Sequence, residues 1–381
     1  MSKSVRGGLG IMENCTNFAR YMKRVLSRSI ITASLAVLFL AGCNDAVDTG
    51  RATVPYVEDI LSEETEGLSL LSSFDPRESR GTIALVGPED TSLVNRFLKV
   101  DDVDNIDGRP NPDLLPDFAG EQIDIINDKA NAPYVALLKN DSVKFRTVAV
   151  RNLMAAIDTA YSIGAFDDEK LQTKLPAKVV VYTSPLNAEI GAFDVDTLCR
   201  ASGCSIPVVF PSRLVFGQQL DRGIEHLHIA VVTDSLTAAS GVYSRVFDDV
   251  SKSKGILGTG CVAVKVDSLD NINTVLSDYK AAGGNMPLSA LVIDSREVDI
   301  DALRVSLDFV MTHQSETNLN SRKLITKDFV IVDMNKAVTD ECYRILRSNN
   351  IFTHNISYPV SRNYVTVKST NSDGYNLVEK D

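Results

Sequence analysis

The chain contains no tryptophan and four histidines in 381 residues, and both shortages narrow the chemistry it can carry. Without tryptophan, any stacking on a sugar or a base must come from phenylalanine or tyrosine. Most aromatic residues at predicted loop positions are expected to lie in the core instead. They are Phe118, Tyr134, Tyr182, Phe216, Tyr243 and Tyr358.

Residue patterns for metal binding and catalysis are also missing. His226 and His228 fall on one face of a strand because side chains alternate, but no third ligand lies near them. His313 and His354 are isolated. No second C-x-x-C pair completes a zinc site, and neither H-E-x-x-H nor G-x-S-x-G occurs. The sequence therefore predicts no metal, no cofactor and no catalytic set.

Positively charged residues are fewer than negatively charged ones. The chain has 39 lysines and arginines against 50 aspartates and glutamates, a formal net charge of -11. Phosphate binding needs a basic surface, so nucleic acid is excluded as a partner. The hydrophobic share of 44% is enough to build the cores of two ordinary domains or one large one.

No apolar run is long enough to span a bilayer. The most extended, residues 30–40 in "SIITASLAVLFLAGC", is flanked by Lys23, Arg24 and Arg28. A basic flank followed by a short apolar run is typical of a signal sequence. "LAGC" at Leu40–Cys43 resembles the lipobox of bacterial lipoproteins.

The lipobox resemblance implies that residues 1–42 are a signal peptide, with Met22 as a more usual start. It implies that Cys43 becomes the acylated first residue of an exported protein, anchored to a bacterial membrane. The sequence does not say which membrane or which face.

Two other cysteines, in "CRASGC", bear on the redox state. Cys199 and Cys204 are close enough in sequence to bridge, and disulfides persist in exported proteins. The alternative is a pair of buried thiols at the end of a helix.

The chain divides into four regions. Residues 43–80 are polar and acidic and predict a tether with one short helix at 57–71, although "GLSLL" leaves open that the segment packs on the body. Residues 81–225 and 226–381 predict a first and a second α/β lobe.

Apolar runs alternate with helical patterns in both predicted lobes. The expected strands cover residues 81–88, 132–138, 178–184 and 205–212, then 228–233, 262–266, 290–293, 329–332, 352–357 and 364–369. The expected helices cover residues 89–100, 144–164 and 186–202, then 237–253, 269–282, 299–316 and 337–348. Short apolar strands between helices predict doubly wound, Rossmann-like parallel sheets that are covered on both faces.

Four of the predicted strands end on an aspartate: Asp234, Asp267, Asp294 and Asp333. Ligands bind outside the carboxyl ends of the strands of an open parallel sheet. We therefore expect these carboxylates, Asp234 and Asp294 first, to bind a ligand. The alternative is that they cap helices, because Asp and Ser are preferred at that position.

Other polar residues share the expected edge. The further candidates for ligand binding are Ser235, which follows the first aspartate, and Thr183, Ser184 and Asn187 in "YTSPLN".

The strand "GTIALVGPED" and the strand, loop and helix "HLHIAVVTDSLTAASGVYSRVFDDV" resemble the type I periplasmic binding proteins. The proline- and aspartate-rich loop at residues 101–120 departs from that family. The resemblance implies two lobes around a ligand cleft. It also implies a non-enzymatic receptor for a small polar solute, such as a sugar or a nucleoside, with envelope or transporter proteins as partners. Two alternatives stay open: an envelope assembly lipoprotein without a small ligand, and a metal-dependent hydrolase that uses the strand-end aspartates.

Overall fold

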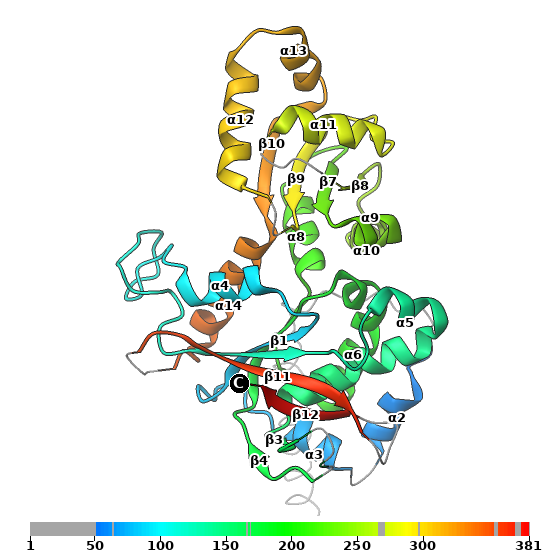
Figure 1. The fold of residues 1–381 in the computed structure, drawn as a ribbon, viewed down its shortest axis with the longest axis vertical. Helices are drawn as coiled ribbons and strands as arrows, with labels where there is room; N and C mark the ends of the chain where they lie inside the picture. Colours follow the sequence, from blue (N-terminus) through cyan, green and yellow to red (C-terminus); the bar gives the residue numbers. More distant parts are fainter. Residues whose placement is uncertain are drawn as a thin grey trace, which may run out of the picture. The chain divides into compact units, whose positions relative to one another are not determined.

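Two sheets of mainly parallel strands organise the mixed α/β fold of the chain in the computed structural model (Figure 1). The structure describes residues 51–62, 65–164, 167, 169–265, 271–295, 298–353, 357–369 and 375–380. All of them fall within one compact unit of the chain.

The first sheet has six strands in the order β12-β11-β2-β1-β5-β6. They are β1 (Thr82–Gly87), β2 (Gln122–Asn127), β5 (Ala177–Tyr182), β6 (Val208–Val209), β11 (Val360–Lys368) and β12 (Tyr375–Lys380). All neighbours pair in parallel except β12, which runs antiparallel to β11 at the edge. The central strands β1 and β5 are buried along their whole length, as parallel strands covered on both faces must be.

The second sheet has four parallel strands in the order β10-β9-β7-β8. They are β7 (His228–Thr233), β8 (Gly260–Lys265), β9 (Leu288–Ile293) and β10 (Ile325–Asp333). Two further strands, β3 (Ala160–Tyr161) and β4 (Gln172–Thr173), form a separate antiparallel pair.

Helices cover both faces of the first sheet. On one face Ile83 and Leu85 pack with Phe97 of α4 (Thr91–Lys99) and with Leu346 of α14 (Met334–Asn349). The other face packs on α6 (Ser142–Ile157), and around it lie α5 (Tyr134–Asn140), the π-helix η1 (Asn187–Gly191) and α7 (Ala192–Ser202).

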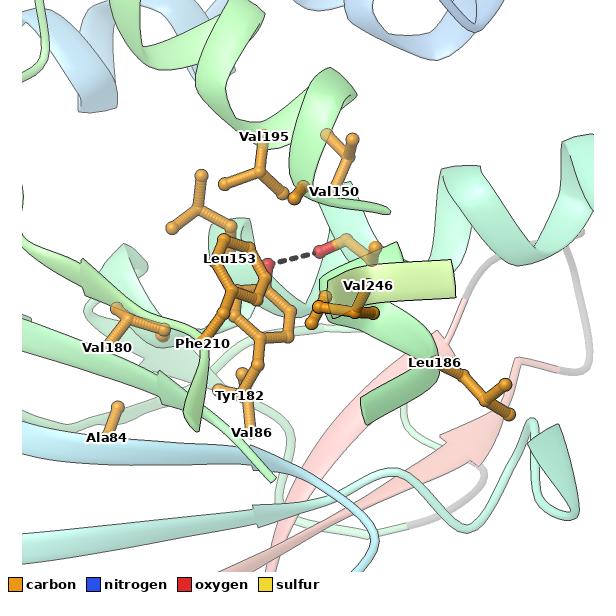
Figure 2. Close-up of a cluster of buried hydrophobic side chains, with 14 of the residues drawn as sticks. Ala84, Val86, Val150, Leu153, Val180, Tyr182, Leu186, Val195, Phe210 and Val246 are labelled. Atoms are coloured by element: carbon orange, nitrogen blue, oxygen red, sulfur yellow. Dashed lines mark hydrogen bonds between the residues drawn. The ribbon is translucent and has the colours of Figure 1, made fainter. Parts of the chain in front are cut away.

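A tyrosine lies at the centre of the second of these cores (Figure 2). Tyr182 at the end of β5 is fully buried and stacks on Phe210, with 4.8 Å between the ring centroids. Its hydroxyl donates to the Ala149 carbonyl at 2.6 Å, so the polar end of the ring is satisfied inside the core.

The second sheet packs between two groups of helices. One apolar face contacts α11 (Ile272–Ala281) and α12 (Ile300–Thr312), while α13 (Glu316–Arg322) contacts β10. On the other side lie α9 (Ser235–Ser240) and α10 (Val242–Ser253), and α8 (Pro211–Leu220) packs on α10. One continuous core therefore runs from the first sheet through α8 and α10 to the second.

The predicted limits of the second lobe differ from the structure. The last part of the predicted region, from α14 through β11 and β12, packs on or pairs with the first sheet. The boundary at residue 226 alone does not separate the two sheets, because the chain returns to the first sheet after β10.

The predicted tether is also corrected where the structure describes it. Helices α2 (Pro55–Leu61) and α3 (Glu66–Ser72) pack on the body through Val57 and Leu71, which are buried. The Val54 N–H donates to Asp194 Oδ1 at 3.0 Å, and Arg146 pairs with the same carboxylate at 2.6 Å. The alternative raised by "GLSLL" is therefore the correct one; residues 43–50 lie outside the described residues.

Several predicted elements differ individually. Residues 134–138 of the strand predicted at 132–138 form the start of α5. Of the strand predicted at 205–212 only β6 is present, and α8 begins at Pro211. No strand is present at 351–353, and β12 was not predicted. Among the described helices, none is both long and apolar enough to cross a membrane.

Candidate active site

The strand-end aspartates of the second sheet have different hydrogen-bond partners and structural roles. Asp234 is exposed and caps α9, since its Oδ1 accepts the Leu236 and Thr237 N–H groups at 2.9 and 3.0 Å. Ser235 is exposed at the first position of that helix. Asp333 caps α14 by accepting the Lys336 N–H at 3.1 Å.

Asp294 directly follows β9 and is half-buried. The hydroxyl of Tyr243, which is fully buried in α10, donates to Asp294 Oδ2. This bond fixes the orientation of the carboxylate. The fourth aspartate, Asp267, lies outside the described residues.

The candidates after β5 are either buried or hydrogen-bonded within the protein. The Thr183 hydroxyl donates to the Pro88 carbonyl at 2.7 Å, and Ser184 is buried. Asn187 is fully buried in η1, where neither amide atom has a hydrogen-bond partner among the described residues. Of these three residues, only Thr183 lines a cavity with Asp294.

A cavity of about 530 Å³ lies where α4 and α14 meet the carboxyl ends of β9 and β10. Its lining is mostly polar, and charged groups of both signs face it. The lining residues are Ser92, Arg96, Asp102, Ile293, Ser295, Val298, Asp299, Ile300, Asp301, Arg304, Asp333, Asn335 and Lys336.

Two cations and one carboxylate form a cluster on one wall of this cavity. Asp102 lies 2.7 Å from Arg96 Nη2 and 2.6 Å from Lys336 Nζ. Burial raises the pKa of Asp102, but the hydrogen bonds and charges of Lys336 and Arg96 outweigh it and hold that pKa below its usual value. Burial lowers the pKa of Lys336, but the carboxylates of Asp102 and Asp340 outweigh burial and raise that pKa above its usual value. Lys336 Nζ also lies 3.1 Å from Asp340 Oδ1, so two carboxylates balance the two cations.

A second cavity, of about 10 Å³, adjoins the Tyr243–Asp294 pair. Asn335 lines both cavities, and its amide donates to the Ser92 hydroxyl at 2.7 Å. The smaller cavity is lined by Asp90, Leu93, Thr183, Pro185, Pro211, Ser212, Tyr243, Asp294, Met334 and Asn335.

The cysteines lie away from both cavities. Cys199 and Cys204 are present as thiols. A hydrogen bond from Cys199 lowers the pKa of Cys204, while burial raises it less. The disulfide between them stays a prediction. In the part of the chain that the structure describes, no group of three or more His, Cys, Asp or Glu side chains is placed to hold a metal ion.

Sequence reasoning missed the charged cluster. Arg96 lies in the last turn of α4 and Lys336 in the first turn of α14, two helices far apart in sequence, and Asp102 lies in the loop after α4. A basic residue shortly after an Asp cap, as in "EDTSLVNR" and "VDMNK", is the local signal that the two helices share.

No family model matches the sequence, and no curated protein matches it. Solved structures do align with it. A glutamate racemase from Bacillus anthracis is 13% identical, covering 76% of this chain and 90% of its own, with a TM-score of 0.41. One from Francisella tularensis, in complex with D-glutamate, is 13% identical, covering 76% and 89%, with a TM-score of 0.42. An arylmalonate decarboxylase is 13% identical, covering 70% and 92%, with a TM-score of 0.30.

The comparison contradicts the predicted solute receptor, because these aligned structures are named as racemases and a decarboxylase, which are enzymes. A physical reason lies in the aspartates that were expected to bind the solute. Asp234 and Asp333 accept backbone N–H groups at helix starts, and Asp294 accepts a tyrosine hydroxyl. TM-scores this low transfer none of the named activities to the chain.

Proposed function

We propose that the chain is an acid–base enzyme that acts on a small carboxylate-bearing substrate in the cavity of about 530 Å³. The observation that carries the proposal is the position of Asp294, which lines the smaller cavity, while its neighbours Ile293 and Ser295 line the larger one. A fixed carboxylate beside a cavity that is lined by charged groups of both signs is an arrangement suited to proton transfer.

The size and charge of the cavity support a small ionic substrate. Its volume falls within the range of about 300–1,000 Å³ that is usual for small-molecule sites. Arg96 and Lys336 share Asp102 as a partner, and Lys336 also pairs with Asp340. A substrate carboxylate would pair with the Arg96 guanidinium, because guanidinium groups bind carboxylates with two parallel hydrogen bonds.

The proposed chemistry is a proton transfer by Asp294. The carboxylate takes a proton from the substrate atom next to the bound carboxylate, becomes a carboxylic acid, and returns the proton in the reverse step. Tyr243 keeps the carboxylate in place, because its hydroxyl donates to Oδ2 from inside the core. This proposal includes the arrangement expected from the sequence, two lobes with a ligand cleft between them.

We expect Asp294→Asn to lower the rate of proton exchange by at least about 100-fold, since an amide cannot act as the base. The measurement is ¹H NMR in D₂O of 2-amino acids, 2-hydroxy acids and dicarboxylic acids with the full chain in detergent. Loss of the α-proton signal reports exchange.

The matched control is Asp234→Asn, at the exposed cap of α9. It should retain the wild-type exchange rate. The proposal fails if no acid in the panel exchanges, or if Asp294→Asn exchanges as fast as the wild type.

We further propose that Cys43 carries lipid and anchors the exported protein to a membrane, on the strength of "LAGC" and its basic and apolar flank. Cys43→Ser should abolish incorporation of labelled palmitate and move the protein from the detergent phase to the aqueous phase in a Triton X-114 partition. Cys199→Ser is the matched control and should keep both. Labelled palmitate in the Cys43→Ser protein would count against the anchor.

A further inference from the structure

A buried hydroxyl without a partner lies at the start of α8. Ser212 is 1% exposed, and its Oγ has no hydrogen-bond partner among the described residues. Burying an unpaired hydroxyl costs free energy, so native structures pair such groups with the protein or with ordered water. Ser212 lines the smaller cavity, so a hydrogen-bond partner for its hydroxyl would lie in that cavity.

The start of α8 adds backbone donors at the same place. The helix has ten residues, and Phe210 at its cap position makes no side-chain cap hydrogen bond. Pro211 at the first position has no N–H to satisfy. The N–H groups of Ser212 and Arg213 lack acceptors within the helix, as in every α-helix.

Hydrogen-bond acceptors line the same cavity as Ser212. Asp294 and Asp90 both line it, together with Tyr243, whose hydroxyl already donates to Asp294. Two carboxylates in so small a space disfavour an anion. A neutral molecule that both accepts and donates hydrogen bonds suits the lining better.

The volume of the smaller cavity limits the size of a molecule that it can hold. About 10 Å³ is close to the least space that holds one water molecule, which also needs two to four polar partners. A substrate carboxylate is too large for it. We propose that the smaller cavity is a single-water site, in which Ser212 Oγ and the start of α8 hold a water molecule against Asp294.

Within the proposed function, on which this part of the inference rests, Ser212 is a positioning residue. The water donates to the Asp294 carboxylate and so favours its charged form. Ser212→Ala should therefore move the acid limb of the pH–rate profile of proton exchange to higher pH. An exchange rate lowered equally at every pH would overturn this role.

The water site itself is tested without any activity, by thermal unfolding of the full chain. Ser212→Ala removes a satisfied hydroxyl and should lower the Tm by about 2 °C. The matched control is Ser289→Ala in β9, because Ser289 is also fully buried with an unpartnered Oγ but lines neither cavity. Removing an unsatisfied hydroxyl should leave its Tm unchanged or higher. A Tm that rises in both variants would overturn the proposal.

Crystal structures of the wild type and Ser212→Ala at about 1.5 Å supply the second measurement. We expect one water within hydrogen-bond distance of Ser212 Oγ in the wild type and none in the variant. A dry cavity, or an anomalous peak there after a bromide soak, would overturn the proposal. Loss of exchange in Asp294→Asn beside a dry cavity would leave the proposed function standing, and a bound water without any exchange would leave the water site standing.

Discussion

Replacing Glu121 by alanine is expected to lower the free energy of unfolding by about 3–5 kcal/mol. Glu121 is fully buried, and its Oε2 lies 2.8 Å from Lys178 Nζ, whose side chain is 3% exposed. The ammonium also donates to the carbonyls of Ile351 and Ser79. Removing the carboxylate leaves a buried ammonium without a counter-charge. The measurement is urea unfolding of wild type and variant at neutral pH.

Two controls separate the loss of the ion pair from other effects. Glu121→Leu with Lys178→Met removes both charges, and should recover much of the stability lost in the single variant. Asp301→Ala breaks a pair with Arg304 at the surface, where the aspartate is 88% exposed, and should cost less than about 1 kcal/mol. A loss in Glu121→Ala as small as that at the surface would refute the prediction.

Replacing Lys174 by methionine is expected to raise the free energy of unfolding by about 1–3 kcal/mol at pH 7. The lysine is 7% exposed, and burial lowers its pKa to about 8 despite the opposing charges of Asp124 and Asp158. Keeping it protonated in the folded chain therefore costs on the order of 3 kcal/mol relative to the unfolded chain. The variant also loses the 2.9 Å bond to the Ala156 carbonyl, which reduces the gain.

The sign of the pH dependence follows from the lowered pKa. Between pH 8 and 10.5 the unfolded chain keeps a proton on Lys174 that the folded chain has released, so the contribution of this group to stability rises with pH. Below pH 8 the lysine is protonated in both states, and the penalty is constant. Urea unfolding at pH 7 and 9.5 should show wild type gaining on Lys174→Met at the higher pH. The control Lys139→Met, at an exposed position of α5, should follow the wild type. The prediction fails if the difference between wild type and Lys174→Met is the same at both pH values.

The local sequence pattern was sufficient to predict most of the second sheet and its helices. The strands β7 and β9 are strongly apolar, and the helices after them have apolar residues at helical spacing and begin at Asp or Ser. It failed for α5, where the short apolar run "YVALL" fits a strand or a buried helix equally well. Pro133 before that run favours a helix start, and Pro211 does the same for α8. Membership of β11 in the first sheet depends on pairing with β2, which no local pattern specifies.

The sequence predicts which aspartates end the strands, but not what surrounds them. Asp294 and Asp333 line cavities at the carboxyl ends of β9 and β10. Whether an aspartate caps a helix or faces a cavity depends on its rotamer and on side chains from elsewhere. Lys336 and Asp102, which meet at 2.6 Å, are 234 residues apart.

The return of the chain to its first sheet sets an order of events during synthesis. β2 is synthesised long before its partner β11. The hydrogen bond that the Thr366 hydroxyl donates to Asp128 forms only after 238 further residues have been made. Until then β2 is an open edge, which is a template for pairing with other chains. A nascent or truncated chain that stops before Val360 therefore exposes an unpaired edge of β2, which can pair with other chains and which β11 covers in the complete protein.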